Sequence, residues 1–219
     1  VLTREQFLRT IEGRVSALNL TSVRPPSDLA TSMSDLAKAL AIIAENSDIV
    51  SVVTSVREIR ETAAAGKLGI ILGTQGSTFL EHDLQLLRVM QRAGIRILQP
   101  TYMEQNALGS GVLALPDKGL TDKGHEWVAL MNELGLLIDL SHVGYQTAID
   151  AAKASKRPVI CSHSNARALC NSLRNIPDEE IRAVAETGGT VRSRAAMPST
   201  SPTPRAIWRA ISAVPPVRL

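Results

Sequence analysis

Cysteine is scarce in this sequence. Among 219 residues only Cys161 and Cys170 are cysteines, which is too few for the disulfide framework of a small secreted domain. What the chain has instead is a hydrophobic content of 44% and enough length to bury one sizeable core. We therefore expect a folded globular protein with one main domain.

Long hydrophobic runs are also absent from the sequence. No run approaches the roughly 20 apolar residues that span a bilayer, and the first residues, VLTREQFLRT, lack the apolar stretch of a signal peptide. We therefore predict a soluble protein with no transmembrane segment, and we favour the cytoplasm as its location.

Acidic side chains are missing from one part of the chain. Residues 192–219 contain five arginines and no Asp or Glu, so 19 of the 24 basic residues and all 21 acidic residues lie in the first 191 positions. The net charge of +3 therefore comes from the C-terminal segment, and the rest of the chain is mildly acidic. This distribution argues against a nucleic-acid-binding domain, which would carry a basic surface.

The C-terminal segment 192–219 also differs from the rest in its pattern. It holds five prolines and no strand or clean helix of useful length. Two explanations stay open: a disordered arm, or an altered C-terminus such as a frame change or a fusion scar, because the strand pattern stops at Val191. We predict a folded domain over 1–191 and an atypical Pro/Arg-rich tail over 192–219.

From residue 14 to residue 191, short β-branched runs alternate with stretches of helical period. Such alternation is typical of β-α units and a parallel sheet. The predicted strands are 14–23, 48–53, 68–73, 95–100, 135–142, 158–163 and 189–191. The predicted helices are 28–45, 56–65, 81–93, 121–134, 145–155 and 177–187.

This element count predicts an α/β fold. It fits most of a TIM-type (β/α)8 barrel, and a smaller doubly wound sheet would fit as well. A complete barrel typically needs about 250 residues, so the barrel would be incomplete. The long loop 103–119, MEQNALGSGVLALPDKG, is a candidate cover for a site at the carboxyl ends of the strands.

Two predicted strands end on histidines, in IDLSH (138–142) and ICSHS (160–164). Alternation along a strand puts Ile138, Leu140 and His142 on one face, as it does Cys161 and His163. Both histidines fall at the carboxyl ends, where parallel α/β folds place their sites. They are either a pair of ligands for zinc, which neutral imidazole suits, or two unconnected hydrogen-bonded histidines.

Other residues with metal-binding or catalytic chemistry have simpler explanations. His82 and His125 are expected to be solvated, and His125-Glu126 lacks the second histidine of a His-Glu-x-x-His zinc helix. Cys161 is expected to be a buried structural thiol. Asp139 is expected to orient neighbouring groups rather than to bind a ligand.

Several motifs in order carry a family resemblance. They are GLT (119–121), MNELG (131–135), IDLSH, SHSNAR (162–167) and RNIPD (174–178), preceded by GIILGTQG (69–76) and LQPTYMEQNALGSG (98–111). With this series, which extends back to about residue 14, the chain resembles the bacterial branch of the renal or membrane dipeptidase family of zinc peptidases. About four-fifths of the chain takes part in the resemblance.

The resemblance implies a metal-dependent hydrolase barrel that hydrolyses dipeptides with zinc-activated water. It implies zinc-ligand roles for His142 and His163 and a substrate-binding role for Arg174, whose guanidinium suits a carboxylate or an oxyanion. Tyr102 stands where the vertebrate enzymes have a substrate-contacting histidine. The partners that we expect are a small dipeptide-like substrate and a second copy of the chain in a homodimer.

The sequence departs from the family pattern at three ligand positions. Gln75 stands where a glutamate bridges the two zincs of the family, and an amide cannot supply that carboxylate. None of the four histidines is followed two residues later by aspartate, so the His-x-Asp pair is absent, and a late aspartate beyond Val191 is missing. At most one zinc is therefore well supported. The alternative is a truncated or degenerate, non-catalytic member that binds one metal or a small anionic ligand.

Overall fold

The computed structural model describes residues 3–193, whose helices and strands alternate along the chain. The helices are α1 (Arg4–Glu12), α2 (Leu29–Glu45), α3 (Val56–Ala64), α4 (Leu86–Arg92), α5 (Asp122–Leu134), α6 (Tyr145–Ala154) and α7 (Asp178–Glu186), with a short 3-10 helix at Thr78–Leu80. The strands are β1 (Ala17–Val23), β2 (Val50–Val52), β3 (Leu68–Thr74), β4 (Ile95–Leu98), β5 (Leu137–Ile138), β6 (Ile160–Ser164) and β7 (Thr190–Ser193).

Every predicted strand and helix has a counterpart in the structure, but two predicted ranges need correction and one helix was not predicted. Helix α1 was not expected; it begins at a capping box in which the side chains of Thr3 and Gln6 each accept the other's backbone N–H. The predicted helix 81–93 begins only at Leu86. The predicted strand 135–142 is reduced to Leu137–Ile138.

The sheet is parallel throughout its named strands, and its strand order is not simply sequential. Strand β3 pairs with β1 along Gly69–Thr74. Its other edge is shared, because β2 pairs with its first residues, Leu68–Ile70, and β4 with its last, Leu72–Thr74. This central strand is almost entirely buried, as expected for a parallel strand covered on both faces.

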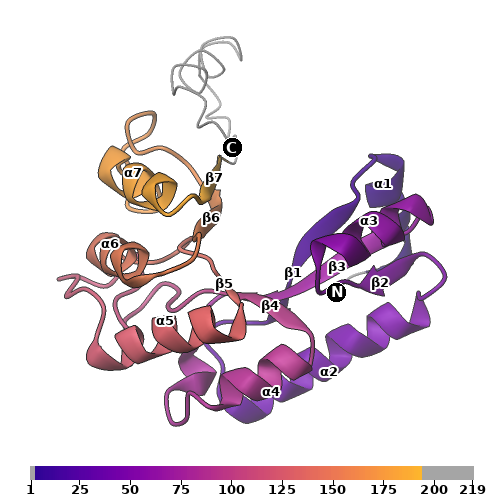
Figure 1. The fold of residues 1–219 in the computed structure, drawn as a ribbon, viewed down its shortest axis with the longest axis horizontal. Helices are drawn as coiled ribbons and strands as arrows, with labels where there is room; N and C mark the ends of the chain where they lie inside the picture. Colours follow the sequence, from indigo (N-terminus) through magenta and orange to yellow (C-terminus); the bar gives the residue numbers. More distant parts are fainter. Residues whose placement is uncertain (1–2, 194–219) are drawn as a thin grey trace.

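The sheet continues as an open arc. Strand β4 pairs with β5, a single bridge between Asp139 and Ile160 leads to β6, and β6 pairs with β7. Figure 1 shows the strands on the inner side of this arc and helices α2, α4, α5, α6 and α7 along its outer side. The fold is α/β with a parallel sheet, as predicted, and among residues 3–193 no pairing closes it into a barrel.

Local signals explain where the helices begin and end. The hydroxyl of Thr121 accepts a hydrogen bond from the backbone of Gly124 at the start of α5, and Gly135 ends that helix in the left-handed conformation at φ 66°. The inward faces of sheet and helices form one continuous core. Its largest fully buried members include Trp127, Phe7, Leu36, Leu68, Ile70, Leu72, Leu80, Leu87 and Met90.

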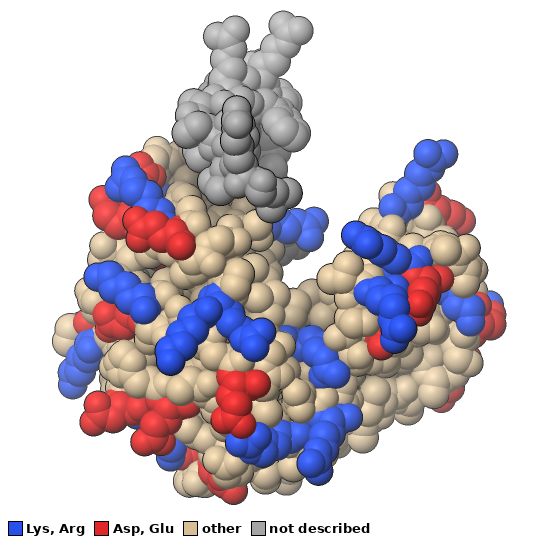
Figure 2. Space-filling model, in the orientation of Figure 1, with Lys and Arg blue, Asp and Glu red and all other residues tan. Residues whose placement is uncertain are grey.

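On the face shown in Figure 2, a hollow lies between the two sides of the arc, and Lys, Arg, Asp and Glu side chains are spread over both sides. The helices of the described region include none that is long and apolar enough to cross a membrane. The predicted tail falls mostly outside the described residues, although Arg192 and Ser193 belong to β7. The predicted homodimer and cytoplasmic location stay predictions.

Candidate active site

The residues predicted for the site lie at or beyond the carboxyl ends of four neighbouring strands. Gln75 follows β3, Tyr102 follows β4, and His142 follows β5. His163 lies within β6, and Arg174 lies in the loop between β6 and α7. Residues up to 99 positions apart in the chain are thus gathered at one edge of the sheet, where parallel α/β folds place their sites.

The two histidine rings are adjacent. Their centroids are 4.9 Å apart and their planes are inclined by 54°. Two imidazoles that bind one tetrahedral ion, each with a nitrogen about 2.0–2.1 Å from it, have centroids about 5 Å apart. The separation of His142 and His163 therefore fits two ligands of a common ion.

His142 does not reach this position by strand alternation, which corrects the sequence argument. The strand ends at Ile138, and His142 lies in a turn with φ 69°, a left-handed conformation that is uncommon for residues other than glycine. Backbone hydrogen bonds hold the turn, because the N–H of Val112 donates to the carbonyl oxygen of His142 at 2.9 Å. The adjacent Ser141 hydroxyl accepts the backbone N–H of His163 at 3.0 Å.

The imidazole of His142 is held in its neutral form. Burial, with smaller contributions from the charges of Arg174 and His163, lowers the pKa of His142 to about 3. Its Nδ1 atom is buried and has no hydrogen-bond partner in the described part of the chain. A neutral imidazole with a buried, unpaired nitrogen has the protonation state that metal binding requires.

His163 is oriented by a hydrogen-bonded chain. The Ser162 hydroxyl donates to Asp139 Oδ2 at 2.5 Å and lies 2.7 Å from His163 Nδ1. Because the hydroxyl proton goes to the carboxylate, we assign the ring proton to Nδ1, which leaves Nε2 of His163 as an acceptor. Asp139 thus acts through Ser162, as groups behind metal-binding histidines commonly do.

Gln75 contacts the acceptor nitrogen of His163. Its amide nitrogen lies 3.1 Å from Nε2, the atom that the hydrogen-bonded chain leaves available as a ligand. A metal at Nε2 therefore requires the Gln75 amide to turn, either presenting its oxygen or moving aside.

Tyr102 and Arg174 complete the cluster. The Tyr102 ring lies 4.3 Å from the His142 ring, centroid to centroid. The guanidinium of Arg174 donates to the Ser164 hydroxyl at 3.1 Å and to the carbonyl oxygen of His163 at 2.8 Å. Arg174 is therefore fixed directly against the strand that carries His163.

A second arginine, which the sequence analysis did not identify, supports Arg174. Arg167 Nε donates to the carbonyl oxygen of Asn175 at 2.9 Å, and its Nη2 donates to that of Leu173 at 3.4 Å. These two carbonyls flank Arg174 in the chain. The motif SHSNAR contains Arg167, but its spacing gives no sign that its side chain returns to residues 173–175.

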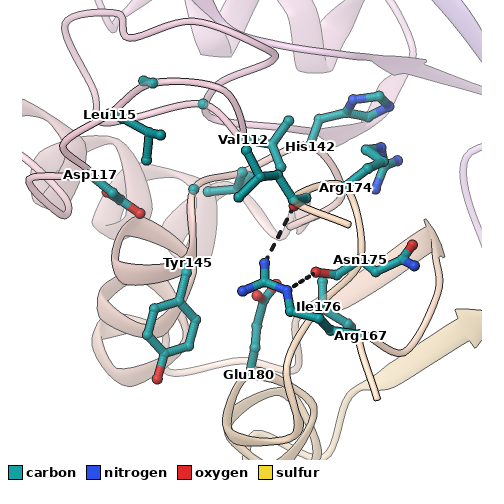
Figure 3. A pocket seen from close by; sticks show the side chains of 15 residues that line it. Val112, Leu115, Asp117, His142, Tyr145, Arg167, Arg174, Asn175, Ile176 and Glu180 are labelled. Carbon is teal, nitrogen blue, oxygen red and sulfur yellow. Dashed lines mark hydrogen bonds between the residues drawn. The ribbon is translucent and has the colours of Figure 1, made fainter. Parts of the chain in front are cut away.

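A pocket of about 220 Å³ adjoins the histidine cluster. Figure 3 shows His142 and Arg174 at one end of it and Glu180, on α7, at the other, below the guanidinium of Arg167. Glu180 is only 2% exposed. The sequence signal that could have revealed it is its spacing of four residues from the buried Val184, which puts a carboxyl on the apolar side of the helix.

The remaining candidates lie where the sequence suggested. His82 and His125 are exposed, and Cys161 is buried in the core; burial also raises the pKa of the Cys161 thiol well above its usual range. Within residues 3–193 no three His, Cys, Asp or Glu side chains form a cluster that could hold a metal. His142 and His163 thus fit two positions of a zinc site, and the described residues provide no third ligand of these types.

A parallel α/β sheet that gathers its candidate site residues beyond the carboxyl ends of its strands has the arrangement in which such folds bind small ligands. The model of the membrane dipeptidase family, peptidase family M19, matches residues 14–207. The chain belongs to this family.

Relatives of this chain include proteins of known structure. An uncharacterised dipeptidase of Schizosaccharomyces pombe is 36% identical over 131 residues, which are 58% of this chain and 32% of the relative. An amidohydrolase from Pseudomonas aeruginosa is 35% identical with a TM-score of 0.84, over 88% of this chain and 59% of that one. A metallopeptidase from Rhodobacter sphaeroides, solved with a phosphinate mimic of the dipeptide L-Ala-D-Ala, is 26% identical with a TM-score of 0.72, over 81% and 52% of the two chains. This chain therefore spans between 32% and 59% of the length of these relatives.

Proposed function

We propose that the protein is a zinc-dependent dipeptidase. The observation that carries the proposal is the pair of adjacent imidazoles, 4.9 Å apart, beside a pocket bordered by Arg174, in a chain of the membrane dipeptidase family. The metallopeptidase relative solved with a dipeptide mimic supports the same class of substrate.

Bound zinc would supply Lewis-acid polarisation of the scissile carbonyl and an acidified water as nucleophile. His142 and His163 would hold the ion, His142 as a neutral imidazole and His163 through Nε2. The chain from Asp139 through Ser162 orients the ring of His163, which supports its role as a ligand.

Arg174 would bind the negative end of the substrate. A guanidinium presents a planar fork of donors that matches a carboxylate, and this one borders the pocket next to His142. Tyr102 packs against His142, and its phenol can donate a hydrogen bond to substrate.

The test is zinc content followed by turnover. The purified 219-residue chain is incubated with zinc, freed of excess metal and analysed, then supplied with dipeptides such as Ala-Ala in both configurations of the second residue. We expect bound zinc and hydrolysis at rates that follow the zinc content. Protein that retains no zinc and hydrolyses no dipeptide rejects the proposal for this chain.

A second function has its own support in the ligand set. Gln75 at the position of the bridging glutamate, together with the lack of a third His, Cys, Asp or Glu near the histidines in residues 3–193, favours a member that binds one metal or a small anion without catalysis. The same experiment separates the two functions, because that member would retain zinc yet leave every dipeptide intact.

A further inference from the structure

Glu180 is a buried carboxyl at the wall of the pocket that adjoins the histidines. Its side chain is 2% exposed, and its Oε1 atom has no hydrogen-bond partner among the described residues. No nitrogen of Arg167 or Arg174 forms an ion pair with it within 4.0 Å. A buried acceptor without a partner costs stability, so its position calls for an explanation.

Helix capping does not explain the position. Glu180 is the third residue of α7, from which a glutamate commonly accepts the backbone N–H of the N-cap residue. The N-cap residue of α7 is Pro177, which has no N–H to donate. The carboxyl of Glu180 lies instead on the buried side of the helix and faces the pocket.

The other charged groups of the pocket already have partners. Asp117 accepts hydrogen bonds from the backbone N–H groups of Gly119 and Gln146 and from the hydroxyl of Thr147. Arg167 is bonded to the two carbonyls that flank Arg174. Glu180 is therefore the charged side chain of this pocket that has a buried oxygen without a partner among the described residues.

Burial raises the pKa of Glu180 to about 8. The positive charges of Arg167 and Arg174 lower this pKa by smaller amounts, and the negative charge of Asp117 raises it further. A cation that enters the pocket would lower that pKa again, because a nearby opposite charge favours the ionised carboxylate. A ligand cation thus supplies the opposite charge that no ion pair within the described residues gives Glu180.

Size and charge define the ligand group. At about 220 Å³ the cavity is smaller than the roughly 300–1,000 Å³ of a site for a whole small molecule, and suits one side chain. If Arg174 is occupied by a substrate carboxylate, the charged groups left along the pocket are Arg167, Asp117 and Glu180. With both carboxyls ionised, the net charge of these three side chains is −1. This charge favours a ligand whose side chain is cationic.

We propose that this pocket is a subsite for the side chain of a basic residue, lysine or arginine, at the carboxyl end of a dipeptide, and that Glu180 binds its cationic group. The inference rests on the proposed function, because it takes Arg174 to bind the adjacent carboxylate. Glu180 is then a specificity-determining residue, at the other end of the pocket from His142.

The test is binding of two probes that differ in charge. Calorimetry with the full chain compares Ala-Lys with Ala-norleucine, each with L and D second residues, since norleucine keeps the aliphatic chain without the ammonium group. We expect Ala-Lys to bind at least tenfold more tightly. We also expect its binding to release protons, measured in buffers of different ionisation enthalpy, because Glu180 ionises.

The variants are Glu180→Gln and, as a matched control on the same helix, Glu179→Gln, whose side chain is exposed. We expect the first to abolish the tenfold preference and the proton release, and the second to retain both. An unchanged preference in Glu180→Gln overturns the inference. If that variant does not fold, the wild-type comparison still decides, because equal or absent binding of the two probes overturns it as well.

Failure of this inference is distinguishable from failure of the proposed function. A zinc-loaded chain that hydrolyses Ala-Ala without preferring Ala-Lys refutes the basic subsite alone. A chain that hydrolyses no dipeptide refutes the dipeptidase, while the binding preference for Ala-Lys is still measured directly.

Discussion

The amide nitrogen of Gln75 lies 3.1 Å from Nε2 of His163. The two residues are 88 positions apart in the chain and come from β3 and β6, with β4 and β5 between them in the sheet. Residue 75 is therefore within direct reach of the proposed zinc ligand. The side chain at residue 75 decides whether this position can bind a metal, because the amide nitrogen of Gln75 donates a hydrogen bond where a carboxylate would offer an oxygen ligand.

We expect Gln75→Glu to strengthen zinc binding. A carboxylate at this position adds an oxygen ligand beside His163, and the gain should be roughly tenfold or more, which corresponds to about 1.4 kcal/mol. Competition with a zinc-sensitive chelator measures it, and Gln75→Leu, which offers no ligand atom, is the matched control. Equal affinities of the glutamate and leucine variants would show that residue 75 does not reach the ion.

Removing either imidazole should remove the metal. Because two nitrogens form the main part of the proposed site, His142→Ala and His163→Ala should each lose any bound zinc, as measured by elemental analysis of the dialysed protein. The exposed His125 provides the control, and His125→Ala should keep the wild-type content. Zinc retained in both site variants would place the ion elsewhere.

Breaking the hydrogen-bonded chain behind His163 should weaken the site without destroying it. Ser162→Ala removes the hydroxyl between Asp139 and His163, so the ring loses the partner of Nδ1. Loss of such a supporting group typically lowers metal affinity about 10–100-fold. Chelator competition checks this value, and Ser155→Ala, at the C-terminal end of α6, should leave the affinity unchanged.

Substitution of Arg167 should affect substrate more than metal. Arg167→Met removes the hydrogen bonds to the carbonyls of Leu173 and Asn175, so Arg174 loses its fixed position. We expect KM for dipeptides to rise about tenfold with zinc content unchanged, and Arg167→Lys to restore part of the loss. A variant that loses zinc in proportion to activity would indicate general unfolding instead.

Glu180 should make stability depend on pH in a specific direction. Its pKa is raised in the folded protein from 4.5 to about 8, mainly by burial, so between these values the unfolded chain releases this proton and the folded chain keeps it. The free energy of unfolding therefore falls as pH rises through this window, by up to roughly 1.4 kcal/mol per pH unit from this group alone.

Urea unfolding of wild type and Glu180→Gln from pH 5 to pH 8 measures that contribution. Glutamine does not titrate, so the stability of the variant should fall less steeply with pH, and the difference between the two proteins should change by a few kcal/mol across the window. Parallel curves would mean that Glu180 is ionised in the folded protein.

The secondary structure was largely predictable because its causes are local. Residues 68–73 form a short apolar run of the length and composition of a strand buried on both faces. Thr121 and Gly135 mark the ends of α5 by their own capping geometry. The prediction was wrong where one pattern fits two structures. Residues 139–142 continue a strand-like run, yet Ser141 and His142 form a turn. The backbone N–H of Val112 donates to the carbonyl oxygen of His142 there, and the Ser141 hydroxyl accepts the backbone N–H of His163.

The candidate site was also predictable in part, because some of its residues belong to short motifs. His142, His163 and Arg174 stand in short motifs that are visible in the sequence. Arg167 reaches its carbonyl partners only once the loop 165–177 has folded back, and no spacing along the chain encodes that contact. The spacing of Glu180 and Val184 indicates a carboxyl on the buried side of α7, but the pocket that this carboxyl borders exists only in the folded chain.

By itself the sequence determined the class of fold and the family, and it identified His142 and His163 as candidate site residues. Hydrophobic periodicity, helix capping and ordered motifs are all properties of residues that are neighbours in the chain. Only the tertiary structure decided that β1 lies beside β3, that the histidine rings approach to 4.9 Å and that a buried carboxyl borders the pocket. The physical reason is that pairing, burial and the resulting pKa shifts depend on which distant side chains exclude water together.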